Sequence, residues 1–349
     1  MKRTDFSPYA MRGALVLSIL AATTLSARAL TINPIYDASV TNSGMAGPIA
    51  SAFSAAAAYF QNTYSDPITV NIGVYWGANG PFTSDPSGGS SIANYLSGYS
   101  YATTYSALTN DAKSASDFTS ITSTTIGNGT TSPLTRFSSF AMPTAEAKAL
   151  GLSVNYGNSY IATAPAWTNY YNFTSVGATS NRDGWISFNS NTNLWFYGQD
   201  SPATNRYDLI GTAEHEISEV LGRITYLDKT NYMPYNLVYD MFRYSGLNNR
   251  STSPTDAGVS FSYDNGTNLL LTYNGPGNGG DLADWAGGNR DAYNAFLTNG
   301  AAMFISGTDG ITLDVIGYDV PEPAAMALLG LGLCGLVLRA RRRYARRKA

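Results

Sequence analysis

The chain has 349 residues, 21 of them Lys or Arg and 24 Asp or Glu. Eleven of the basic residues lie in residues 1–29 and 320–349, where only Asp5 and Glu322 are acidic, so the body between these segments has a net charge of about −12. An acidic body argues against nucleic-acid binding, and because the single cysteine, Cys334, lies in the C-terminal segment, the body has no disulfide bond.

The first 29 residues have the order of a secretory signal peptide. Basic residues precede an apolar run over residues 14–25, and Ala27 and Ala29 then form a small-x-small cleavage site around Arg28. A transmembrane anchor is the alternative, but the run is short and ends in the cleavage pattern. We therefore expect Sec-type export and a mature chain that starts near Leu30.

The body, residues 30–319, is long enough for one large domain with a sizeable core. Its patterns predict, in chain order, a helix over 48–64, a strand over 68–76, a second helix over 105–117, a short capped helix over 144–150, a hairpin of strands over 184–189 and 193–197, and a helix over 208–223. No repeat of fixed period is present, which argues against a solenoid or a propeller. This order predicts an α+β fold with a mixed β-sheet.

The helix over 208–223 carries the most specific chemical pattern. Apolar residues recur along it at steps of three and four, Asp208 is placed to cap its start, and Gly222 is placed to end it. On such a helix His215 and Glu219 stand one turn apart on one face, with Glu216 beside them.

This spacing is that of the zinc-peptidase helix His-Glu-x-x-His, with Glu219 in place of the second histidine. Two side chains one turn apart can bind a single ion, and Glu is an accepted zinc ligand. Glu216 would then serve as general base toward a water molecule. The pattern also occurs by chance in solvated helices, but His215 is the only histidine in the chain.

A third ligand must come from a carboxylate or a neutral oxygen, because no other histidine exists. The position six residues after Glu219 is Thr225, a poor ligand, so the short-spaced metzincin arrangement does not apply. The acidic candidates downstream are Asp228, Asp240, Asp264, Asp281 and Asp284.

From residue 49 to residue 319 the body loosely resembles the leishmanolysin-like peptidases and related secreted bacterial proteins. The stretch 279–285 matches the segment in which those proteins place a His-Trp pair, and Asp284 stands where that histidine would be. The resemblance implies a zincin-like fold with an active-site helix, with His215, Glu219 and Asp284 as metal ligands and Glu216 as the catalytic residue. Asp240 is an alternative ligand.

The stretch 310–318 resembles the closing segment of the same proteins. We expect it to pack under the site, with Asp309 and Asp314 as caps or hydrogen-bond acceptors.

The expected cofactor is a divalent metal, with Zn as the first choice and Mn or Ca as alternatives. Two carboxylate ligands neutralise the charge of the ion, which lowers its Lewis acidity and favours harder ions. Arg223 and Tyr244 are candidates for oxyanion stabilisation.

Besides an exported metallopeptidase that acts on a polypeptide substrate, two other functions remain open. One is a non-catalytic extracellular or biofilm-matrix protein that binds an ion or, through some of its 25 tyrosines, a glycan. Most of those tyrosines are expected on a loop-rich polar surface. The other is a glycosidase that uses paired carboxylates such as Asp281 and Asp284.

Residues 320–349 form the C-terminal segment. Pro321, Glu322 and Pro323 precede an apolar run over 324–338 and a basic tail over 339–348. As a helix the run is about 22 Å long, against a hydrocarbon core of about 30 Å, and flanking arginines extend its reach. The segment resembles the PEP-CTERM sorting signal of exported bacterial proteins. The resemblance implies transient anchoring in the inner membrane of a Gram-negative-type bacterium, processing by an exosortase-type enzyme, and release to the cell surface or an extracellular matrix.

Overall fold

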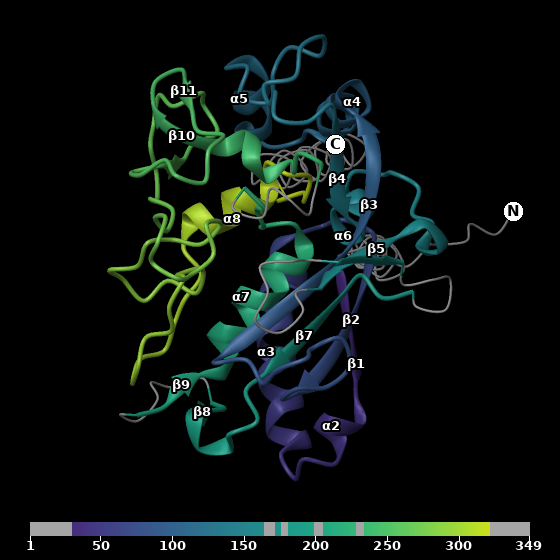
Figure 1. Ribbon diagram of the computed structural model, residues 1–349, viewed down its shortest axis with the longest axis vertical. Helices are drawn as coiled ribbons and strands as arrows, with labels where there is room; N and C mark the ends of the chain where they lie inside the picture. Colours follow the sequence, from purple (N-terminus) through teal and green to yellow (C-terminus); the bar gives the residue numbers. More distant parts are fainter. Residues whose placement is uncertain (1–29, 164–171, 176–180, 199–204, 228–233, 322–349) are drawn as a thin grey trace, which may run out of the picture.

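The computed structural model describes residues 30–163, 172–175, 181–198, 205–227 and 234–321 (Figure 1). The expected signal peptide with Ala27 and Ala29, the motif residues Glu322 and Pro323, and the expected anchor over 324–338 lie outside these ranges. Within them, no helix has both the length and the apolar character needed to cross a membrane.

A seven-stranded mixed sheet forms the centre of the fold, in agreement with the expected α+β class. The strands β1 (Thr31–Tyr36), β2 (Thr69–Trp76) and β7 (Gly184–Phe188) run parallel, with β2 in the middle. The long strand β3 (Gly89–Ser100) is antiparallel to β7 through its first five residues, and then pairs with β4 (Ser139–Pro143) and β5 (Tyr160–Thr163). The last strand, β6 (Asn172–Ser175), pairs with β5.

Two helices, α3 (Ala46–Thr63) and α7 (Leu209–Leu221), pack against each other and cover one face of this sheet (Figure 1). The buried face of α3 contains Ile49, Phe53 and Phe60, which recur at helical spacing. On α7 the residues Ala213, Ile217 and Val220 are fully buried. The two apolar stripes form the main core, which fixes both the position of α7 along its axis and the face that it turns toward the sheet.

Shorter elements complete the described chain. They are α2 (Ala38–Thr41), α4 (Tyr101–Asp111), α5 (Ala115–Thr122), α6 (Thr144–Ala149), α8 (Gly307–Asp314), β8 (Trp195–Phe196), β9 (Tyr207–Asp208), β10 (Arg243–Gly246), β11 (Asn249–Arg250), β12 (Ser260–Phe261) and 3₁₀ turns at Tyr156–Asn158, Thr192–Leu194 and Tyr239–Phe242.

Residues 234–320 follow α7 with little regular structure and lie along one side of it (Figure 1). Their position is fixed by long-range hydrogen bonds to buried groups. Trp285 Nε1 donates to Asp309 Oδ1 at 2.7 Å, and Tyr318 Oη donates to the Leu221 carbonyl at the end of α7 at 2.8 Å. Near the end of this segment, the Asp319 N–H donates to Asp66 Oδ2 at 2.9 Å and the Asp319 carbonyl accepts from the Ser65 N–H.

Six of the elements expected from the sequence are present, namely the helices near 48–64, 144–150 and 208–223 and the strands near 68–76, 184–189 and 193–197. The single helix expected over 105–117 is wrong, because Ser114 and Asp117 form a capping box that starts a separate helix, α5. The expected hairpin is also wrong, because β8 pairs with β9 in parallel instead of with β7. The helix α6 is present but has no side-chain cap.

The tyrosines also differ from the expectation of a polar surface. Seven of the largest fully buried side chains are tyrosines: Tyr64, Tyr95, Tyr239, Tyr244, Tyr273, Tyr293 and Tyr318. Their rings pack on other aromatic rings and on buried arginines. For example, the ring centroids of Tyr273 and Trp285 are 5.1 Å apart. Many of the tyrosines therefore belong to the core.

Candidate metal centre

The helix α7 begins and ends where its sequence predicts. The Asp208 carboxylate accepts a hydrogen bond from the Ile210 N–H at 3.0 Å, which caps the start. Gly222 has a φ of 128° at the other end, a conformation that disfavours a side chain. This geometry places His215, Glu216 and Glu219 on the middle two turns of a rigid, buried helix.

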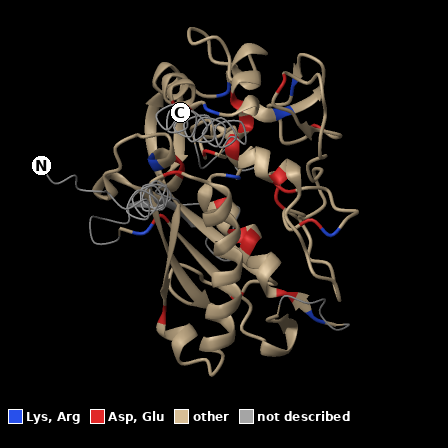
Figure 2. Cartoon of the chain, turned by 180° about the vertical axis from the view of Figure 1, so that it is seen from behind, with Lys and Arg blue, Asp and Glu red and all other residues tan. Residues whose placement is uncertain are grey.

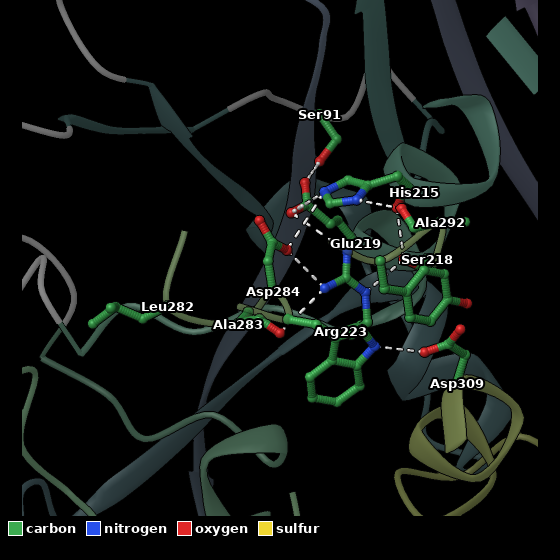
Figure 3. Close-up of polar contacts among 12 residues, drawn as sticks. Ser91, His215, Ser218, Glu219, Arg223, Leu282, Ala283, Asp284, Ala292 and Asp309 are labelled. Carbon is green, nitrogen blue, oxygen red and sulfur yellow. Dashed lines mark hydrogen bonds and ion pairs between the residues drawn. The ribbon is translucent and has the colours of Figure 1, made fainter. Parts of the chain in front are cut away.

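Three side chains from two separate segments converge beside α7 (Figure 3). His215 Nε2 lies 3.4 Å from Glu219 Oε1 and 3.4 Å from Asp284 Oδ1. The three residues offer one ligand atom each, and all three atoms lie within 4.8 Å of one another. The structure thus brings together the histidine and the two acids that the sequence suggested as a ligand set.

The imidazole of His215 is oriented by a backbone group. Its Nδ1 lies 2.9 Å from the carbonyl oxygen of Ala292, and because a carbonyl only accepts, Nδ1 must carry the proton. The other nitrogen, Nε2, therefore faces the two carboxylates. This is the arrangement that metal-ligating histidines usually have.

Glu219 is held in the same way. Its Oε2 accepts a hydrogen bond from Ser91 Oγ on β3 at 2.6 Å. Its Oε1 is buried without a hydrogen-bond partner and points toward the imidazole. A buried, unpartnered carboxylate oxygen is costly unless a cation or a donor faces it, so this atom fits a metal ion at the convergence point.

Glu216 lies at the wall of a cavity of about 520 Å³ that also contains His215, Glu219 and Asp284. The carboxyl group is packed against the start of β3, where Gly89 leaves room for it. A side chain at Gly89 would place its first carbon 2.4 Å from Glu216 Oε1. Glu216 therefore faces the same space as the three converging groups, as a general base requires.

Burial and charge set the protonation of this cluster. Burial lowers the pKa of His215, but the carboxylates of Asp284 and Glu219 raise it by more, to about 10. Burial together with the Glu219 charge raises the pKa of Glu216 well above its ordinary range. Burial raises the pKa of Glu219, but the adjacent His215 and Arg223 lower it by more, so it lies below its usual value.

A buried arginine contacts two of the three converging side chains. The side chain of Arg223 is fully buried, and its Nη1 donates to Asp284 Oδ1 at 2.8 Å. Its Nη2 lies 3.8 Å from Glu219 Oε1. Arg223 does not line the cavity, so it is not placed to stabilise an oxyanion there.

The remaining sequence candidates lie elsewhere or play other roles. Asp240 is hydrogen-bonded to Thr225 Oγ1 and is not part of the convergent group. Asp264 accepts from Ser262 and Asn268 in a surface turn. Tyr244 is buried and donates to Asn265 Oδ1 at 3.0 Å. Asp228 lies outside the described residues.

Asp281 is the one remaining acidic candidate that reaches the cavity. It lines the same space as Asp284, but Asp284 is bound to Arg223 and faces His215. Burial raises the pKa of Asp284, while the adjacent His215 and Arg223 oppose that rise.

Asp309 and Asp314 act as hydrogen-bond acceptors, as expected for the closing segment. Asp309 forms a capping box with Ser306 at the start of α8 and accepts from Trp285. Asp314 accepts from Ser114 Oγ at 2.6 Å. The bond from Trp285 to Asp309 links α8 to the residue that follows Asp284.

A second carboxylate group is present among the described residues, formed by Asp66, Asp111 and Asp319. Lys113 Nζ makes an ion pair with Asp319 in this group. No sequence pattern indicates this group, and the lysine already supplies a positive charge.

Comparison with known proteins identifies the C-terminal segment. A family model described as the PEP-CTERM protein-sorting motif matches residues 319–343. The chain therefore carries a sorting signal that implies export, transient membrane anchoring before processing by an exosortase-type enzyme, and sorting to the cell surface or matrix. No curated protein and no solved structure matches the chain.

Sequence patterns did not single out two residues that shape the site. Ser91 is one of many serines in a polar stretch, and nothing local indicates that it contacts Glu219 across 128 positions. Ala292 contributes only a carbonyl, which no sequence pattern can predict. Arg223 follows the helix-ending Gly222, but this position alone does not predict its contact with Asp284.

Proposed function

We propose that the protein is an exported metal-dependent peptidase, sorted through its C-terminal signal, in which His215, Glu219 and Asp284 hold a divalent ion and Glu216 is the general base. The observation that carries this proposal is the convergence of His215 Nε2 with Glu219 Oε1 and Asp284 Oδ1 at 3.4 Å each. Three such ligands with an open side toward a cavity are typical of a catalytic site, because structural sites are closed by four protein ligands.

When bound, the ion would supply Lewis acidity toward a carbonyl and toward water. The residues of the chain would do the rest. Glu216 would take a proton from water and pass it to the leaving amine, which requires the carboxylate form. A nearby cation favours that form, so the raised pKa of Glu216 in the metal-free protein would fall toward the working range.

The cavity wall supports a polypeptide as substrate. Gly89, Ser90 and Ser91 of β3 line the cavity, and in the described part of the chain only β7 pairs with this half of the strand. One edge of its backbone therefore has free N–H and C=O groups, which an extended peptide can pair with as an added strand.

The test combines metal analysis with a casein or gelatin assay on the purified protein. We expect bound zinc and hydrolysis that stops when a chelator is added. Glu216→Gln should lower the rate of hydrolysis at least about 100-fold with metal content unchanged. The control is Glu214→Gln, two residues earlier on the same helix and outside the cavity wall, which should keep the rate. Full activity and full metal content after His215→Ala would refute the proposal.

The second candidate is a non-catalytic, ion-binding protein of the surface or matrix. It is favoured by the two carboxylates in the ligand set, which offset the charge of a divalent ion. Stoichiometric metal with no cleavage of either protein substrate would support this candidate instead.

A further inference from the structure

The two carboxylates of the proposed ligand set share one buried cation, Arg223. Its Nη1 contacts Asp284 Oδ1 at 2.8 Å and its Nη2 lies 3.8 Å from Glu219 Oε1. These are the same two oxygen atoms that face His215 Nε2 (Figure 3). The guanidinium group therefore lies against the ligand set on the side away from the cavity.

Other contacts fix the guanidinium group in this position. Its Nε donates to Ser218 Oγ at 2.7 Å, Nη1 also donates to the Ala283 carbonyl at 3.2 Å, and the planar group lies 4.3 Å from the centre of the Tyr293 ring. Only Nη2 has no hydrogen-bond partner. An arginine held at so many points serves as a rigid template for the groups that it contacts.

The charge of Arg223 changes the net charge of the site. A neutral histidine and two carboxylates carry two negative charges, enough to cancel those of a divalent ion. The buried guanidinium group returns one positive charge at hydrogen-bond distance from a ligand, where it is weakly screened. The divalent ion, its three ligands and Arg223 would together carry one net positive charge in spite of the two acidic ligands.

The contacts also limit how many oxygen atoms the site offers. The Ser91 hydroxyl group occupies Glu219 Oε2, which leaves Oε1 as the ligand atom of Glu219, and the hydrogen bond from Arg223 takes up one lone pair of Asp284 Oδ1. Ca²⁺ requires six to eight oxygen ligands and commonly uses both oxygens of a carboxylate, whereas Zn²⁺ is satisfied by three protein ligands and a water.

Resting on the proposed function, we propose that Arg223 is a positioning residue that sets the metal preference of the site. It holds Asp284 through a hydrogen bond to Oδ1 and tempers the charge of both carboxylates, so that a small four-coordinate ion such as Zn²⁺ is favoured over Ca²⁺. Without it the site would be more negative and its acidic ligands less constrained, which is the condition that favours Ca²⁺.

A second buried arginine, Arg243, serves as a matched control for the proposed role of Arg223. Arg243 is also buried, donates to the neighbouring Leu282 carbonyl, and lies 4.3 Å from the centre of the Tyr273 ring. It has no contact with His215, Glu219 or Asp284 among the ion pairs and hydrogen bonds of the described residues. Arg243→Met removes a buried arginine of the same kind without touching the ligand set.

The experiment measures the dissociation constants of Zn²⁺ and Ca²⁺ for the purified wild-type protein, Arg223→Met, Arg223→Lys and Arg243→Met, by competition with chelators. We expect Arg223→Met to lower the ratio of Zn²⁺ to Ca²⁺ affinity at least about tenfold, the usual effect of losing a group that orients metal ligands. Arg223→Lys should lie between it and the wild type, and Arg243→Met should keep the ratio within about twofold.

A ratio unchanged in Arg223→Met, or a ratio equally lowered in Arg243→Met, overturns the inference about Arg223 while leaving the proposed function intact. A wild-type protein that binds neither ion overturns both. If circular dichroism shows that Arg223→Met is unfolded, Arg223→Lys decides, because a ratio equal to that of the wild type would then contradict the role of the guanidinium fork.

Discussion

Each side chain of the ligand set is held by a second group. Ala292 orients His215, Ser91 holds Glu219, and Arg223 holds Asp284. These partners come from three different parts of the chain, so the site is organised before any ion binds. The price of that organisation is a metal-free cluster in which an imidazolium ion sits between two acids.

The proton on His215 makes metal binding depend on pH. Since the pKa of His215 in the metal-free protein is about 10, an ion must displace this proton at neutral pH. We expect Zn²⁺ affinity to rise at least about tenfold per unit between about pH 6 and 9, with release of one proton from His215 and up to one more from Glu216 per ion. Isothermal titration calorimetry in two buffers of different ionisation enthalpy measures that release, and binding without proton release would contradict the assigned protonation.

The same group predicts how stability of the metal-free protein varies with pH. Its pKa is raised from 6.5 to about 10 in the folded state. The stabilisation is therefore fully present below pH 6.5 and is lost as the pH rises toward 10. Thermal unfolding of the chelator-treated protein between pH 6.5 and 10 should show a melting temperature that falls as the pH rises.

Among the elements, contact between β3 and α7 places Glu216, the proposed general base, at the cavity. Gly89 of β3 lies against Glu216 and Thr212 of α7, and a side chain there would meet Glu216 Oε1 at 2.4 Å and Thr212 Cγ2 at 2.8 Å. The two elements can approach this closely only because the strand position has no side chain.

Gly89→Ala should therefore lower peptidase activity at least about tenfold by displacing the Glu216 carboxyl group, because small misplacements of catalytic groups have large effects on rate. The overall fold should persist, since the collision involves side-chain ends of α7. Gly246→Ala, at a position with nothing within 4 Å of the added carbon, is the control that should leave activity unchanged. Equal activity of both variants would argue against Glu216 as the base.

A second contact between elements involves a buried carboxyl group. Glu146 of α6 is 1% exposed, and its Oε1 has no hydrogen-bond partner. Its other oxygen lies close to Gly222 at the end of α7. Burial raises the pKa of Glu146 well above its ordinary value, so the neutral form is favoured in the folded protein.

Because this carboxyl pKa is raised on folding, Glu146 lowers stability as the pH rises above its ordinary pKa of 4.5. Glu146→Gln mimics the neutral form and should raise the free energy of unfolding by about 1–2 kcal/mol at about pH 8, with little change at about pH 4. Urea unfolding at both pH values measures the difference. A variant whose stability changes equally at both pH values would contradict a raised carboxyl pKa for Glu146.

The elements also show how far sequence reasoning reaches. The helix with His215 was predictable because its apolar spacing, its Asp208 cap and its terminal Gly222 all indicate the same bounds. The strand β3 was not predicted, because Gly89, Ser90 and Ser91 have low strand propensity and are held in the sheet by β7. The division between α4 and α5 depended on a capping box that the surrounding Ser and Thr residues obscure.

The site was partly predictable for the same physical reason. His215, Glu216 and Glu219 lie on one helix, where spacing fixes direction. Asp284 lies 61 positions after Arg223 in a segment of little regular structure, and only the resemblance to leishmanolysin-like peptidases suggested it. Tertiary contacts such as the bond between Trp285 and Asp309 decide where this segment runs, and no local pattern encodes them.

At the scale of the whole molecule, the acidic body and the basic sorting segment are separate parts of the chain. Figure 2 shows the basic residues of the body as few and scattered, with acidic residues recurring along α7 and the segments near it. The sorting motif over residues 319–343 lies at the opposite end of the sequence from the export signal that we expect over residues 1–29. The body between them contains the whole candidate site.

Replacing Pro321, Glu322 and Pro323 with alanine should therefore block processing without changing the metal site. We expect the variant to stay in the membrane fraction at unprocessed mass, with the metal content of the wild type. Cell fractionation followed by immunoblotting and metal analysis checks this. Glu216→Gln is the control and should be processed normally, and release of the alanine variant into the medium would contradict a sorting role for these three residues.

The hydrogen bond from Tyr318 to the last turn of α7 has a consequence for timing. A polypeptide that leaves the cell with its first residues in front delivers Tyr318 and Asp319 at the very end of translocation. Until that point the exported part of the chain would lack this support at the end of its principal helix. Under the proposed function, the site on that helix would therefore reach its final form only outside the cytoplasm.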